Sequence, residues 1–90
     1  MKEEKRIRKF FASFFELPSE IVLNLPLITL VGKDELNIEN YKGIIEYSDV
    51  KIRVKTTCGI LKIEGRALTI KQLTNENLVI RGHITELLYI

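Results

Sequence analysis

The sequence predicts a mainly β fold, a small antiparallel β-sandwich or roll of six to eight short strands preceded by an N-terminal amphipathic α-helix. Three observations support this fold class. Apolar residues recur with helical spacing near the N-terminus, and from Leu27 onward the hydrophobic period changes to two. The apolar segments after Leu27 are short, and Gly, Asn, Asp and Ser separate them.

Residues 1–17 are predicted to form a basic and aromatic helix. Its apolar stripe has the i, i+3, i+4, i+7, i+8 spacing of an amphipathic helix and consists of Ile7, Phe10, Phe11, Phe14 and Phe15. The basic residues of the other face are Lys5, Arg6, Arg8 and Lys9. Pro18 ends the helix, because the residue before a proline avoids the α region. Residues 18–26 then form a connector that Pro26 closes.

Residues 27–90 are predicted to form the β domain, and the chain as a whole is predicted to be a single domain. Its strand-like segments are LITLV, ELNIE, GIIEYS, VKIRVKT, GILKIE, ALTIKQL, NLVIRG and ITELLYI. Apolar and basic residues alternate most regularly in VKIRVKT. In this segment we expect Val50, Ile52 and Val54 to face the core, and the basic residues between them to face water.

Three glycines leave two architectures open. Gly59, Gly65 and Gly82 are predicted to mark turns between strands. These turns are either tight hairpins of a sandwich or roll, or the corners of a short β-solenoid. Because the spacing of the three glycines has no fixed period, the sandwich or roll is favoured.

Composition excludes several classes of protein. The net charge of +2 arises within residues 1–16, since residues 17–90 carry equal numbers of acidic and basic side chains. No apolar run reaches the roughly 20 residues that span a bilayer, and no signal-peptide cleavage site follows the apolar run near the N-terminus. We therefore expect a cytoplasmic protein.

Cys58 is the only cysteine, which excludes an internal disulfide, and it is expected to be a small buried side chain.

Nothing in the residue pattern indicates catalysis. The only histidine, His83, follows Gly82 at a predicted turn, where histidines are usually surface residues. The acidic residues are scattered, and there is no phosphate-binding glycine loop, nucleophile motif or zinc spacing. We expect no enzymatic activity, no cofactor and no metal site.

A basic row on the β domain raises the question of nucleic-acid binding. It comprises Lys51, Arg53 and Lys55, with Lys62, Lys71 and Arg81 as candidates to extend it. Binders of single strands place aromatic side chains among the basic ones so that bases can stack. The aromatic residues of the β domain, Tyr41, Tyr47 and Tyr89, are not beside the row. The row is therefore interpreted as a solvated sheet face, and no nucleic-acid partner is expected.

The phenylalanine stripe is the feature with functional weight. Three roles are open to it: packing on the core of the β domain, insertion into a membrane surface, or docking on a protein partner. For docking, the candidate residues are Phe10, Phe11, Phe14 and Phe15, assisted electrostatically by Lys5, Arg6, Arg8 and Lys9. A protein partner at a membrane would use both the apolar and the basic face.

The chain from about Glu16 to Tyr89 resembles the YabP/YqfC family of sporulation proteins, and most closely its YqfC branch, which also begins with a basic, aromatic-rich segment. The resemblance lies in an ordered series of residues: Leu17-Pro18, Leu25-Pro26 leading into Ile28-Thr29, Gly32, Ile38-Glu39-Asn40, Gly43, Tyr47-Ser48, Gly59, Gly65, Gly82 and Tyr89. No single motif in this series is chemically specific.

The resemblance implies a protein made in the mother cell of an endospore-forming bacterium, without enzymatic activity or cofactor, and with a sporulation membrane protein as partner. We accordingly expect an adaptor or assembly factor at the forespore-facing membrane, with peripheral membrane contact. The alternative is a self-assembling scaffold made of many copies of the chain, and a single-stranded nucleic-acid-binding β-barrel ranks third.

Overall fold

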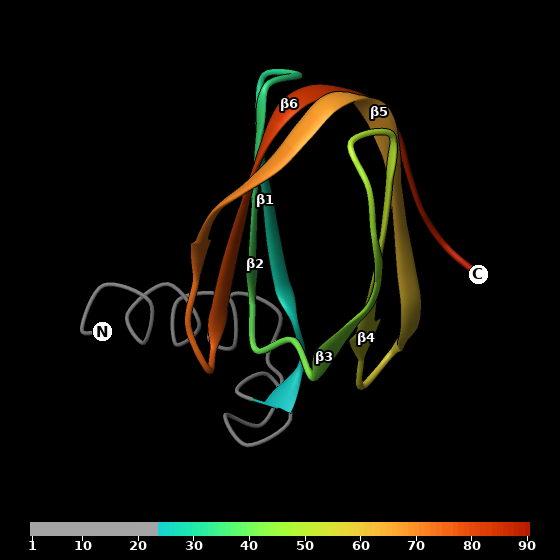
Figure 1. Cartoon of the computed structure of the whole chain (residues 1–90). Coiled ribbons are helices and arrows are strands. Elements are labelled where there is room, and N and C mark those ends of the chain that lie inside the picture. The colour runs from blue at the N-terminus through green and yellow to red at the C-terminus, as the bar shows by residue number, and fades with distance from the viewer. Residues whose placement is uncertain (1–23) are drawn as a thin grey trace.

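A computed structural model describes residues 24–90, which form one antiparallel sheet of six strands (Figure 1). The strands are β1 (Leu27–Val31), β2 (Glu35–Glu39), β3 (Gly43–Tyr47), β4 (Lys51–Thr56), β5 (Gly59–Leu73) and β6 (Asn77–Tyr89). They lie in the order β1-β2-β6-β5-β4-β3. The predicted helix over residues 1–17 lies outside the described residues, as does most of the predicted connector.

The two longest strands fold the sheet onto itself. β5 has 15 residues and β6 has 13, and they arch together from one wall of the domain to the other (Figure 1). β2 pairs with the first part of β6, whereas β4 pairs with the first part of β5. The result is a roll with two facing layers, as expected for the sandwich or roll. A β-solenoid is excluded, because its rungs stack in parallel and every strand pair here is antiparallel.

Gly65 and Gly82 are bends within strands, and their prediction as turns between strands was wrong. GILKIE and ALTIKQL are consecutive parts of β5, and NLVIRG and ITELLYI belong to β6 and the residues around it. At Gly82, φ is +143°, and a Cβ atom would lie 2.6 Å from the carbonyl oxygen of Ala67. The absence of side chains at the two bends lets the paired strands cross the corner in close contact.

The two outer hairpins close against these bends. The turn between β1 and β2 accepts hydrogen bonds from β6: Gly82 N donates to Asp34 O at 3.1 Å, and Ile84 N donates to Lys33 O at 2.8 Å. The turn between β3 and β4 does the same for β5, where the donors are Gly65 N and Leu68 N and the acceptors are Val50 O and Asp49 O. Each bend is therefore held by the turn of a neighbouring hairpin.

The core lies between the two layers, and within residues 24–90 its buried members are all aliphatic, with Tyr41 among the side chains packed against them. Its buried members are Leu36, Ile38, Ile52, Val54, Leu61, Ile63, Leu68, Leu78, Ile80 and Ile84. Ile52 and Val54 face the core as the alternation in VKIRVKT predicts. Val50 does not: it precedes β4, is 52% exposed and uses its carbonyl oxygen to hold the β5 bend.

Candidate functional site

The predicted docking residues, Phe10, Phe11, Phe14 and Phe15 with Lys5, Arg6, Arg8 and Lys9, all lie outside the described residues. The structure does define where their segment joins the β domain. Asn24 O accepts a hydrogen bond from Thr57 Oγ1 at 3.1 Å, and Leu25 O accepts one from Asn40 Nδ2 at 3.3 Å. The chain therefore enters β1 at a point fixed by both the β2–β3 and the β4–β5 connection.

Asn40 supports this junction through its backbone conformation. Its φ is +63°, in the left-handed region that asparagine tolerates better than other non-glycine residues, and its N donates to Glu76 O at 2.6 Å. Asn40 thus turns the chain between β2 and β3, and its side-chain amide donates to Leu25 O. Three connections meet at this end of the roll, since Tyr41 Oη also donates to Thr74 O.

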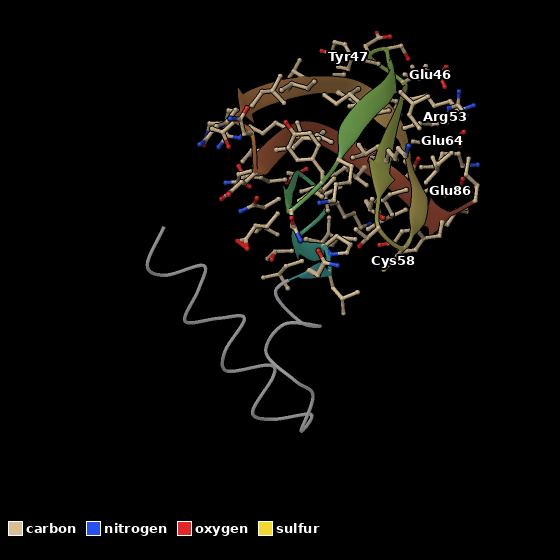
Figure 2. All side chains as sticks on the ribbon, turned by 90° about the horizontal axis from the view of Figure 1, so that it is seen from below. Glu46, Tyr47, Arg53, Cys58, Glu64 and Glu86 are labelled. Atoms are coloured by element: carbon tan, nitrogen blue, oxygen red, sulfur yellow. The ribbon has the colours of Figure 1, made fainter. Side chains whose placement is uncertain are left out.

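Two of the three basic residues in the row on β4 are paired with an acidic residue of the neighbouring strand β3. Arg53 Nε donates to Glu46 Oε1 of β3 at 2.7 Å, and Lys51 Nζ lies 4.0 Å from the same oxygen. In Figure 2 Glu46, Arg53, Glu64 and Glu86 follow one another along the same side of the domain. Lys51 and Arg53 thus share one carboxylate, whereas Lys55 is exposed and forms no ion pair with any residue from 24 to 90.

Lys62 of β5 continues this surface next to Arg53, its partner in the strand register. Its Nζ lies 2.9 Å from Glu86 Oε1 and 3.7 Å from Glu64 Oε2. The hydrogen bond to Glu86, together with the negative charges of Glu64 and Glu86, raises the pKa of Lys62 above 10.5 and outweighs partial desolvation, which lowers it. The ammonium group of Lys62 is therefore held by carboxylates of β5 and β6, the two strands to which it and Glu86 belong.

Lys71 and Arg81 do not extend the basic row. They lie on the part of the roll formed with β2, where Arg81 Nε donates to Glu35 Oε1 at 3.0 Å and Lys71 Nζ lies 4.0 Å from that oxygen. An open hollow of about 550 Å³ adjoins this cluster, lined by Val31, Gly32, Asp34, Glu35, Arg81 and Gly82. Of the charged residues in its lining, Glu35 and Arg81 are paired with each other.

Cys58 is exposed, and its predicted burial was wrong. It occupies the tight turn between β4 and β5, where its N donates to Thr56 Oγ1 at 3.0 Å. A turn of this kind places its central side chains in solvent whatever their polarity. His83 lies within β6 next to the bend rather than in a turn, and it is half-buried opposite Arg66.

Sequence reasoning did not find a group of acceptors on the outer face of β2 and β6. The carbonyl oxygens Oδ1 of Asn37 and Asn77 are shielded from solvent and accept no hydrogen bond. Glu39 is 7% exposed on the same side of β2. The alternation of ELNIE places all of these polar residues away from the core, but it gives no sign that the outer face is shielded.

Within residues 24–90 no cluster of three or more His, Cys, Asp or Glu side chains could hold a metal ion. In that same part of the chain, none of the helices has the length and apolar character needed to span a membrane.

The fold and surface define a small all-β domain: one antiparallel sheet rolled around an aliphatic core, with several ion pairs between neighbouring strands. The chain belongs to the YabP family, whose family model matches residues 24–90. It is also similar to the uncharacterized protein YqfC of Bacillus subtilis (strain 168), with 27% identity over 89 residues that cover 99% of this chain and 96% of that protein. The resemblance seen in the sequence is thereby confirmed.

Proposed function

We propose that this protein is a non-catalytic factor of endospore formation that acts in the mother cell as an adaptor or assembly factor at the forespore-facing membrane. Residues 1–17 supply the docking surface, with Phe10, Phe11, Phe14 and Phe15 making the apolar contacts and the basic face assisting. The partner is a sporulation membrane protein. The β domain is the rigid body that the docking segment attaches to the membrane.

The observation that carries this proposal is the extent of the two family relations. The family match covers the whole described β domain, residues 24–90, while the similarity to YqfC covers 99% of the chain and thus takes in the basic, aromatic segment as well. The relative therefore has a stretch that aligns with residues 1–17 as well as with the β domain. Their role in spore formation follows from the resemblance to the YabP/YqfC family.

The geometry of the junction supports an adaptor. Asn24 and Leu25 are hydrogen-bonded to Thr57 and Asn40, so the described chain joins the β domain at one defined end. A partner that binds residues 1–17 would thereby be linked to the β domain through this end. Burying one phenylalanine contributes about 1.5–3 kcal/mol, so several of them suffice for a stable contact.

The test is the location of a fluorescent fusion in a sporulating host, with a Phe11→Ser, Phe14→Ser double variant beside the intact chain. The matched control is Ile45→Ser, Leu73→Ser, which removes two exposed apolar side chains from the β domain. We expect the intact chain and the control to surround the forespore, and the phenylalanine variant to become diffuse.

Purified variants must be compared by circular dichroism and thermal unfolding. A folded phenylalanine variant that still surrounds the forespore contradicts the proposal. So does a variant that loses cooperative unfolding, because the phenylalanines would then belong to the core of the β domain.

A further inference from the structure

Within residues 24–90, four strand segments of the roll have a paired strand on only one side. They are β1, β3, residues 69–73 of β5 and residues 83–89 of β6. In an antiparallel sheet every second residue of such a segment directs its N–H and C=O groups outward. An open edge is a template for pairing with another strand unless something prevents it.

Three of these edges carry the features that discourage pairing. β3 has a bulge at Ile45, followed by the charged Glu46. In β5 the extra residue of a bulge is itself a lysine, Lys71. β6 has a bulge at Thr85, followed by Glu86. A bulge interrupts the regular outward row of backbone groups, and a charge would have to lose water to enter a new sheet.

β1 carries neither feature. Its sequence, LITLV, has no charged residue, and its register with β2 runs without a shift from Leu27 opposite Glu39 to Val31 opposite Glu35. Leu30 is 48% exposed and Val31 is 57% exposed. Within the described part of the chain, the strand at this edge of the roll (Figure 1) is thus regular, uncharged and without a bulge.

We propose that β1 pairs with β1 of a second copy of the chain, antiparallel, about a twofold axis that passes between the two Thr29 residues. In this register Ile28 lies opposite Leu30 of the second copy, on the face that carries the core residues Leu36 and Ile38. Leu27 lies opposite Val31 of the second copy on the outer face. Every opposed pair is apolar, except the central pair of threonines, which is itself a favourable cross-strand pair.

The residues that flank β1 limit the length of the pairing, and the absence of charge in β1 favours a second copy of the chain as the partner strand. Pro26 has no N–H to donate, and Gly32 turns the chain with φ +57°, so the pairing is limited to the five residues of β1. In a twofold interface a charge near the axis would face its own copy. A strand without charge avoids that repulsion and also offers no countercharge to an acidic or basic peptide, which favours a second copy.

This association closes on itself. A twofold pairing through one edge uses that edge in both copies and gives a dimer with a sheet continuous across both, whereas a filament would require a second unprotected edge. The other open edges of the described domain are the protected ones. The dimer requires no contact from residues 1–17 and is independent of the proposed docking function.

The first experiment measures the mass of the full chain by sedimentation equilibrium over a range of concentrations at low ionic strength. Thr29→Lys places two like charges opposite each other, and we expect it to weaken the dimer on the order of tenfold or more. The matched control is Gln72→Lys, which adds the same charge at the bulged edge of β5 and should leave the dimer unchanged. A monomeric intact chain at concentrations up to roughly 1 mM, or a dimer that Thr29→Lys does not weaken, overturns the proposal.

A cysteine variant tests the same pairing in case Thr29→Lys does not fold. Thr29→Cys in a Cys58→Ser background brings two thiols face to face across the axis, where Cβ atoms of directly opposed residues are about 4.5–5.5 Å apart. Mild oxidation should convert most of the chain into a covalent dimer, and Gln72→Cys in the same background should stay largely monomeric. Equal cross-linking of the two cysteine variants overturns the proposal.

Discussion

A Cβ atom placed on Gly65 would lie 2.0 Å from the carbonyl oxygen of His83. The same atom would lie 3.1 Å from the Cα of Ile84, so backbone surrounds the glycine where β5 and β6 cross the corner of the roll. Backbone cannot rotate away as a flexible side chain can. Gly65 is therefore required by contact and not by an unusual φ angle.

Gly65→Ala is expected to lower the free energy of unfolding by about 3 kcal/mol or more, because the two strands must separate at the bend. Urea unfolding measures the change. Gly43→Ala is the control: a Cβ there would meet no atom within 4 Å. Its effect should be within about 1 kcal/mol in either direction. Equal effects of the two substitutions would show that the strands do not touch at Gly65.

Asn37→Val is expected to raise the free energy of unfolding by about 1 kcal/mol. The Oδ1 atom of Asn37 is shielded and accepts no hydrogen bond, and valine suits a strand better than asparagine. Gln72→Val serves as the control, because Gln72 is exposed on β5 opposite Val79, which is also the partner of Asn37 on β2. The gain at Asn37 should exceed the gain at Gln72 in urea unfolding. A loss of stability in Asn37→Val would show that the amide has a structural role.

Lys62 should make stability depend on alkaline pH. Its hydrogen bond to Glu86 raises its pKa in the folded chain above 10.5, so its stabilising contribution is complete below that pH and is lost as the pH rises through the folded value. Urea unfolding of the intact chain and of Lys62→Met, between about pH 8 and 11.5, should give a stability difference that shrinks with rising pH.

Lys55→Met is the control for this pH series, since Lys55 is exposed and forms no ion pair with any residue from 24 to 90. Its stability difference from the intact chain should change less over the same range. A constant difference for Lys62→Met would mean that Glu86 and Glu64 do not hold the ammonium group in solution.

Local patterns predicted the strands but not the way in which β5 and β6 join the layers. The alternation around Ile52 and Val54 identified β4 correctly, because one face of that strand is buried and the other is wet. Gly65 and Gly82 were mistaken for turns because a glycine at a turn and a glycine at a strand bend look alike in sequence. They differ in what lies opposite them, and this depends on pairing between distant segments.

The candidate site could be predicted only in part for the same reason. The basic row of β4 was visible in the sequence, but the pairing of Lys51 and Arg53 with Glu46, and of Lys62 with Glu64 and Glu86, depends on strand order. The open edge of β1 was also invisible, since LITLV reads as any apolar strand. The predicted docking residues stay predictions, because they lie outside the described part of the chain.

The strand order has a consequence for the time at which the fold can form. β5 and β6 are joined by a short turn, so their pairing needs little chain to be brought together, and β4 adds next to β5 through another short turn. β2, in contrast, pairs only with β1 and β6, and its Glu35 meets Arg81 across a separation of 46 residues. During synthesis the β1–β2 hairpin therefore cannot pair with the rest of the sheet, and its core residues Leu36 and Ile38 stay without their β6 neighbours, until residues 77–81 have been made.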